Sequence, residues 1–272
     1  MNVIEMTPPR LPQRRREAHK GDFGRVHIIA GSVGYTGAPV FAANAAVRGG
    51  AGLVFLGVPE KIYPIIATKC DEAMPYPLPK NIEEILKKLS DADVLLLGPG
   101  LGQSKPTEVL VLELLRKLAC PIVLDADGIN IAARHIDVLD ARAALTILTP
   151  HAGEFARLGG DPKGGAAAAA AFAEKHNCTL VLKGHRTITA YADGTLYRNT
   201  TGNPGMARGG SGDALAGLMA ALLAQGIPPE TAVWLHGRAG DLAAEEFGEY
   251  GMTVGDLISK LPQALKECTD IS

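Results

Sequence analysis

The sequence predicts an α/β fold with one mostly parallel sheet and helices on both of its faces. Short apolar runs alternate with helical patterns along most of the chain, which is the order of elements in a parallel sheet with crossover helices. The runs are unbroken, as expected for strands that are covered on both faces. Several lead directly into glycine-rich or polar loops, which is typical of a sheet that binds ligands at the carboxyl ends of its strands.

Length and composition favour one large domain. The chain has 272 residues, of which 47% are hydrophobic and 21% charged, and its formal net charge is −2. This near-neutral charge gives no reason to expect nucleic acid or an anionic membrane as a partner. We find no internal repeat and no dividing linker, so residues 1–272 are expected to form a single domain in which residues 1–20 are an extended polar arm.

Cysteine usage and the N-terminal region indicate a cytoplasmic protein. The four cysteines lie far apart without a Cys-x-x-Cys pair, so reduced thiols are expected rather than disulfides or a zinc site. Three arginines at 14–16 are not followed by the apolar segment of a signal peptide. No stretch approaches the roughly 18 uninterrupted apolar residues of a transmembrane helix.

Apolar runs and turn residues give the expected order of elements. Strands are predicted at 26–30, 53–58, 94–97, 122–124, 145–148 and 180–182, with a hairpin at 187–191 and 195–197. Helices are predicted at 38–48, 81–89, 106–118, 165–176, 230–247 and 253–265, and more weakly at 60–69. The proline-rich segment 74–79 is expected to be a connector.

Residues 202–226 are where we expect the chemistry. The first half is rich in glycine, and the second half is an apolar run that ends at Gly226, so a loop leads into a helix. Ser211 is the expected N-cap, and Asp213 lies in the first turn. Free backbone N–H groups and the helix dipole make this an anion site. Asp213 alone more often complements the dipole, but beside a phosphate it can act as a general base.

Other predicted strands also end in polar or glycine residues. A single loop of this kind is explained by turns and helix caps, but so many in one structural position favour a ligand cleft. The sets are 31–37, 98–102, Asp125 with Asp127 and Asn130, His151 with Glu154, and Lys183 with Gly184.

His151 and Glu154 lie three residues apart but lack the further ligands of a zinc site. Glu154 either holds Mg²⁺ through water or is a first-turn acid of the next helix, and the local sequence does not separate the two. Lys183 fits a phosphate contact or an exposed position, and Thr187 a phosphate or backbone contact. His236, on a late helix, is more typical of a core or surface position than of a catalyst.

Motifs spread along the chain match one known family. The most specific are Leu-Thr-Pro-His-x-Gly-Glu at 148–154, Lys-Gly-x-x-Thr at 183–187 and Gly-Asn-Pro-Gly-Met-Ala-x-Gly-Gly-Ser-Gly-Asp at 202–213, and further matches lie at 19–24, 30–38, 98–102 and 124–126. On these residues the chain resembles the ribokinase-like ADP/ATP-dependent NAD(P)H-hydrate dehydratases, the carboxy-terminal half of bifunctional nicotinamide nucleotide repair enzymes. Arg208 departs from the pattern, because a small hydroxyl residue is common there.

The resemblance implies a three-layer α/β/α ribokinase-like fold and a metabolite-repair reaction. The S-form of hydrated NADH or NADPH (NADHX or NADPHX) is dehydrated with ADP or ATP, which leaves AMP or ADP and phosphate. The hydrate hydroxyl accepts a phosphoryl group that then departs, and Mg²⁺ assists. The resemblance further implies a homotetramer and an NAD(P)H-hydrate epimerase on a separate chain.

The same resemblance assigns roles to particular residues. Asp213 is the general base, and the amides of Gly209, Gly210, Ser211 and Gly212 form an anion hole for the transferred group. Contacts to the hydrate fall on Ala38, Gly102, His151 and Asp213. Contacts to the adenine nucleotide fall on Lys183, Gly184, His185, Arg186, Thr187 and Gly212. Glu154 is the candidate metal ligand, through water.

Two other functions fit parts of this pattern. A small-alcohol or vitamin-precursor kinase of the same fold would keep Asp213 and the glycine turn but release a stable phosphorylated product. A nucleotide-sensing module would use Asp213 only as a helix-terminal acid, which leaves the anion hole and the possible metal ligand unexplained. The choice between ADP and ATP stays open, and the missing targeting segment favours ADP.

Overall fold

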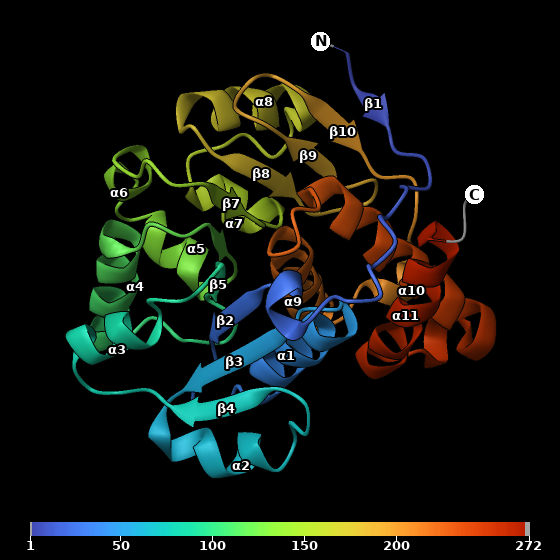
Figure 1. Cartoon of the computed structure of the whole chain (residues 1–272). Coiled ribbons are helices and arrows are strands. Elements are labelled where there is room, and N and C mark those ends of the chain that lie inside the picture. Colours follow the sequence, from blue (N-terminus) through green and yellow to red (C-terminus); the bar gives the residue numbers. More distant parts are fainter. Residues whose placement is uncertain (1, 270–272) are drawn as a thin grey trace.

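A ten-stranded sheet lies at the centre of the computed structural model, which describes residues 2–269 (Figure 1). The strand order is β1-β10-β9-β8-β7-β6-β5-β2-β3-β4, and all neighbours are parallel except β9, which is antiparallel to β8 and to β10. The strands are β1 (Ile4–Glu5), β2 (Arg25–Ile29), β3 (Leu53–Val58), β4 (Met74–Pro77), β5 (Val94–Leu97), β6 (Ile122–Leu124), β7 (Thr146–Leu148), β8 (Thr179–Leu182), β9 (Ile188–Ala190) and β10 (Leu196–Arg198).

Helices cover both faces, so the predicted three-layer α/β/α fold is confirmed. One layer comprises α1 (Gly37–Arg48), α2 (Tyr63–Ala67), α9 (Ser211–Leu223), α10 (Pro229–Gly251) and α11 (Val254–Thr269). The other comprises α3 (Ile82–Lys88), α4 (Lys105–Lys117), α5 (Asp127–Ala132), α6 (Asp137–Asp140), α7 (Ala152–Arg157) and α8 (Gly165–Lys175). Single turns of 3-10 helix lie at Lys20–Phe23, Glu60–Ile62 and Pro204–Met206.

The strands are unbroken apolar runs because helices cover both faces of the sheet, as the sequence predicts. Successive residues of a strand point to opposite faces of the sheet. In β2, Ile28 packs in the core of the first layer and Ile29 in the core of the second, and both are fully buried. A polar residue at either position would therefore lose its contact with water.

The segment 74–79 is not merely a connector, because Met74–Pro77 forms the edge strand β4 beside β3. Proline has no N–H to donate, so within a sheet it is confined mainly to edge strands. The prolines of this segment therefore argued against a strand in the prediction from sequence. At the opposite edge, the arm of residues 1–20 is also partly regular. Ile4 and Glu5 pair in parallel with Tyr197 and Arg198.

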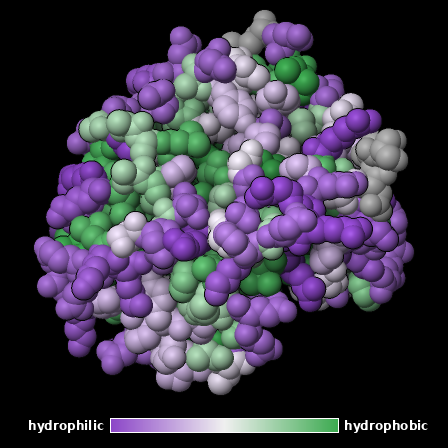
Figure 2. Space-filling model, in the orientation of Figure 1, coloured by the Kyte–Doolittle hydropathy of each residue, from purple (hydrophilic) through white to green (hydrophobic). Residues whose placement is uncertain are grey.

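No helix within residues 2–269 is both long and apolar enough to cross a membrane. Hydrophilic residues occupy most of the outline of the face shown in Figure 2, and apolar residues are visible nearer its centre. Two exposed large side chains, Val33 and Tyr35, belong to the glycine-rich loop that follows β2.

Candidate functional site

The loop and helix predicted at 202–226 are formed, with one correction. The N-cap of α9 is Gly210 and not Ser211, which is instead the first helical residue and is buried. Gly210 has a φ of 98°, a left-handed conformation that glycine adopts without strain. A β-carbon there would also lie 2.7 Å from the Phe41 ring. Helix geometry leaves the first backbone N–H groups of α9 without intrahelical partners.

The first part of the same loop is anchored by Asp241 of α10. Its carboxylate accepts hydrogen bonds from the Gly202 backbone N–H at 2.9 Å and from the Asn203 side-chain amide at 3.0 Å. Asn203 in turn accepts a hydrogen bond from the Gly205 N–H at 3.0 Å. These hydrogen bonds fix the conformation of the glycine loop. The role of Asp241 could not be predicted from local sequence, because this residue is far from the loop along the chain.

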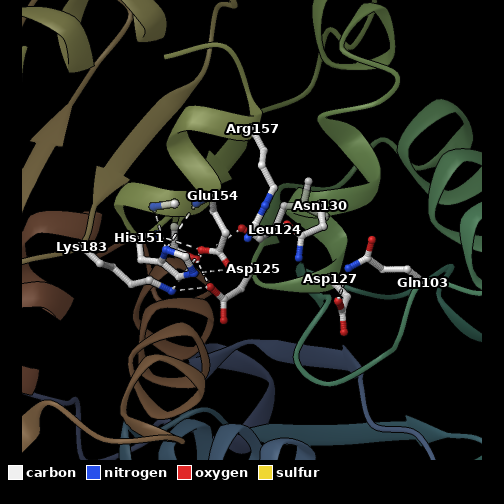
Figure 3. A network of polar contacts seen from close by, with 11 residues as sticks. Gln103, Leu124, Asp125, Asp127, Asn130, His151, Glu154, Arg157 and Lys183 are labelled. Atoms are coloured by element: carbon white, nitrogen blue, oxygen red, sulfur yellow. Dashed lines mark hydrogen bonds and ion pairs between the residues drawn. The ribbon is translucent and has the colours of Figure 1, made fainter. Parts of the chain in front are cut away.

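A partly buried ion pair joins the ends of two strands beside this turn (Figure 3). The Nζ of Lys183, after β8, lies 2.8 Å from Asp125 Oδ1, after β6, and 4.0 Å from Glu154 Oε2. Asp125 is 1% exposed and also accepts a 2.7 Å hydrogen bond from Thr149 Oγ1. A β-carbon at Gly212 would lie 3.2 Å from Lys183 Nζ, so this ammonium group borders the N-terminus of α9.

The charges of this cluster shift the pKa values of its members. Burial raises the pKa of Asp213 to about 6, and the negative charges of Asp125 and Glu154 add to this rise against the opposing effect of Lys183. Burial would lower the pKa of Lys183, but Asp125 and Glu154 outweigh it, so the pKa of Lys183 is raised. The cluster thus combines a permanent cation with a carboxylate whose pKa lies near neutrality.

His151 and Glu154 begin α7 as a capping box. The backbone N–H of His151 donates to Glu154 Oε2 at 2.9 Å, while the Gly153 N–H donates to His151 Nδ1 at 2.9 Å. Glu154 is therefore a first-turn acid of α7, as one of the two sequence readings proposed, and it is 5% exposed. His151 is exposed and lies beside Lys183 through an isolated β-bridge.

His236 of α10 is a buried histidine, in keeping with its predicted core or surface position. Burial lowers the pKa of its imidazole to about 4, so the ring is neutral at pH 7. It faces the backbone of Ser211, and its Nε2 lacks a hydrogen-bond partner among the described residues. This places a neutral ring directly behind the first turn of α9.

The residues predicted to contact the hydrate lie on neighbouring loops. Ser32 Oγ donates to the Gly100 carbonyl at 2.8 Å, which joins the loop after β2 to the loop after β5. A β-carbon at Gly100 would lie 3.1 Å from Ala38 Cβ, so the start of α1 touches the same loop. Gly102, with a φ of 72°, donates its N–H to Asp127 Oδ2 at 2.8 Å.

Of the residues predicted to contact the nucleotide, those at 183–187 form a tight turn between β8 and β9, whereas Gly212 lies in the first turn of α9. The Gly184 N–H donates to Thr187 Oγ1 at 3.3 Å, and the Thr187 hydroxyl donates to the Gly184 carbonyl at 3.1 Å. His185 is exposed in this turn. Arg186 has a φ of 58°, and its guanidinium pairs with Glu5 of β1 rather than with the central cluster.

In the described part of the chain, no three His, Cys, Asp or Glu side chains converge as a metal site. Glu154 already accepts from the His151 backbone, so it fits a cation held through water and not a direct protein cage. A cation that is bound chiefly by phosphate oxygens requires no such cage.

These features define an α/β protein with a helix N-terminus suited to an anion such as phosphate, and an acid beside it, at the carboxyl edge of its sheet. Comparison with known families is more specific. Residues 26–263 match the model of the NAD(P)H-hydrate dehydratase family, and the chain belongs to this family.

Individual relatives agree with this assignment. The chain is 37% identical to the ADP-dependent (S)-NAD(P)H-hydrate dehydratase of Listeria monocytogenes over 94% of its own length and 92% of the relative. It is 42% identical to the bifunctional NAD(P)H-hydrate repair enzyme of Moorella thermoacetica, but it spans only 52% of that protein. The ADP/ATP-dependent NAD(P)H-hydrate dehydratase of Bacillus subtilis, co-crystallized with ATP/Mg²⁺, has a TM-score of 0.83 and 32% identity, covering 98% of this chain and 99% of that one.

Proposed function

We propose that this chain is an ADP- or ATP-dependent (S)-NAD(P)H-hydrate dehydratase and that residues 1–272 act as one catalytic domain. The hydroxyl of the hydrated nicotinamide ring attacks the terminal phosphoryl group of ADP or ATP, and AMP or ADP leaves. The resulting phosphate ester then loses inorganic phosphate and a ring proton, which restores NAD(P)H. Water is thus removed from the substrate at the cost of one phosphoanhydride bond.

The observation that carries the proposal is the Asp213 carboxyl, with its raised pKa, in the first turn of α9. A base with a pKa near the working pH combines a useful ionised fraction with a useful proton affinity. Asp213 would take the hydroxyl proton as the phosphoryl group is transferred. An acid that merely served the helix dipole would have no reason to be partly buried beside two other carboxylates, whereas a general base whose pKa must be raised does.

The neighbouring groups would bind and orient the phosphoryl group. The backbone N–H groups of residues 209–212 would stabilise its developing charge. Lys183 is fixed by Asp125 and borders Gly212, so its ammonium group would meet a phosphate oxygen. Ala38, Gly102 and His151 would contact the hydrate, and the 183–187 turn would contact the adenine nucleotide.

A bound Mg²⁺ would neutralise phosphate charge on the nucleotide. We propose Glu154 as its protein contact, through water, because the carboxylate faces Lys183 at the same edge of the sheet. We also propose ADP or ATP as donor, a homotetramer, a cytoplasmic location and cooperation with an epimerase on a separate chain.

The decisive experiment incubates the protein with Mg²⁺, (S)-NADHX or (S)-NADPHX, and ADP or ATP. Recovery of the reduced-nicotinamide absorbance measures the reaction. Asp213→Asn should lower kcat by about 100-fold or more, the usual scale for loss of a general base. Asp71→Asn, at an exposed position outside the site, is the matched control and should retain full activity.

Each outcome has a distinct meaning. Absence of recovery with either nucleotide in the unaltered protein would exclude the dehydratase. Full activity in Asp213→Asn would exclude its assigned role while leaving the reaction in place. Accumulation of a stable phosphorylated alcohol would instead identify a small-alcohol kinase.

A further inference from the structure

A cavity lies between α5 and the C-terminal end of α7. Its volume is about 470 Å³, and its lining comprises Gln103, Asn130, Ala133, Arg134 and Arg157. Two of these five side chains are cationic and none is acidic. The cavity therefore presents positive charge and amide groups, which suits an anion.

The two arginines are held in place by the same asparagine. Arg157 Nη1 donates to Asn130 Oδ1 at 2.8 Å, and Arg134 Nη1 donates to the Asn130 carbonyl at 3.3 Å and to Gln103 Oε1 at 2.8 Å. Such contacts orient the planar guanidinium groups before any ligand arrives. Arginine in a fixed orientation recognises phosphate through paired N–H donors.

The two positive charges differ in how far they are neutralised. Arg134 Nη2 lies 3.1 Å from Glu108 Oε2, and Lys105 and Arg134 together lower the pKa of Glu108 to about 2, so that carboxylate stays ionised. Over residues 2–269, Arg157 has a neutral amide partner and no ion pair. Arg157 should therefore attract an anion more strongly, whereas Arg134 chiefly contributes hydrogen-bond donors.

Figure 3 shows Gln103, Asn130 and Arg157 of the cavity lining on one side of the central polar cluster, close to Asp127. Arg157 ends α7, whose N-cap is His151, so it lies about 9 Å further along the helix at 1.5 Å per residue. Gln103 follows Gly102, and both donate to Asp127, at 3.0 and 2.8 Å. A ligand whose ring lies beside Gly102 and His151 can reach the cavity with its anionic end.

We propose that this cavity is a subsite for a phosphate group of the hydrated dinucleotide, with Arg157 as its principal contact. The inference rests on the proposed dehydratase function, because that substrate carries a ring at one end and phosphates several bonds away. The phosphates of the nucleotide donor are assigned to the α9 N-terminus, which lies in the opposite helix layer. The cavity would thus determine affinity for the hydrate and not for the donor.

The test measures KM and kcat for (S)-NADHX, (S)-NADPHX and ADP in three variants. Arg157→Gln should raise KM for the hydrate about tenfold, the scale of a lost charge-assisted hydrogen bond, with kcat and the KM for ADP nearly unchanged. Arg134→Gln should have a smaller effect, and Arg157→Lys should restore part of the affinity. Arg116→Gln is the control, because Arg116 pairs with Glu113 on α4, away from the cavity.

The choice of hydrate identifies which phosphate is bound. A KM increase for both hydrates places the pyrophosphate in the cavity, and an increase confined to (S)-NADPHX places the 2′-phosphate there. Equilibrium binding of NADH and NADPH, followed by fluorescence, gives the same comparison without turnover.

Unchanged hydrate KM and unchanged dinucleotide binding in Arg157→Gln would overturn the inference, and so would an increase confined to the KM for ADP. These results differ from failure of the proposed function, in which the unaltered protein itself has no dehydratase activity. Thermal unfolding of each variant separates lost affinity from lost structure, and rescue by Arg157→Lys would not follow from a packing defect.

Discussion

At the scale of single residues, the proposed chemistry depends on the ionisation of Asp213. Burial and then the charges of Asp125 and Glu154 raise its pKa to about 6. A protonated carboxyl cannot accept the hydroxyl proton, so activity should be present above the pKa and lost below it. We expect kcat/KM to fall about tenfold per pH unit below a midpoint near 6, as one required ionisation predicts.

A pH profile of kcat/KM at saturating Mg²⁺ and nucleotide measures this midpoint. The residual activity of Asp213→Asn is the control, because its profile should lack the acidic limb that belongs to Asp213. A midpoint near 4, the ordinary value of an aspartate, would show that the burial of this carboxyl does not persist in the working enzyme.

At the scale of elements, close contact between α1 and α9 positions the glycine turn at 209–212, the proposed anion hole. A β-carbon at Gly217 of α9 would lie 2.0 Å from the Ala42 carbonyl oxygen of α1, so the two helices can approach only because this residue is glycine. Gly217→Ala must push them apart. We expect a loss of about 1–3 kcal/mol in the free energy of unfolding, the usual scale of overpacking.

Urea unfolding measures this loss, with Gly251→Ala as the matched control. Gly251 ends α10, and a β-carbon there would have no packing neighbour within 4 Å, so alanine meets open space. Its free energy of unfolding should change by less than about 1 kcal/mol. Equal stability of the two variants would show that α1 and α9 adjust to the added methyl group.

The elements also show how far the sequence alone leads. The long helices and apolar strands, the hairpin of β9 and β10, and the loop before α9 follow from local patterns. Local rules failed at β4, where prolines masked an edge strand, and at Ser211, because the cap is the left-handed Gly210. The Asp125–Lys183 pair and the Asp241 anchor join residues far apart in the chain, so only the fold reveals them.

At the scale of the whole molecule, the N-terminal arm protects one edge of the sheet and touches the predicted nucleotide turn. β1 pairs with β10, and Glu5 forms ion pairs with Arg186 and Arg198. An uncovered strand edge exposes backbone groups that can pair with another chain. The arm therefore has a structural role that its polar, aperiodic sequence does not indicate.

Deleting residues 2–9 should lower the free energy of unfolding and cause concentration-dependent association beyond that of the unaltered protein, since β10 becomes the edge strand. Urea unfolding and light scattering over a range of concentrations measure the two effects. Glu5→Gln removes only the exposed ion pairs and should cost less than about 1 kcal/mol, because such pairs contribute little individually. A deletion that leaves stability and association unchanged would show that β1 is dispensable, whereas an equal effect of Glu5→Gln would assign the arm's contribution to charge rather than to strand pairing.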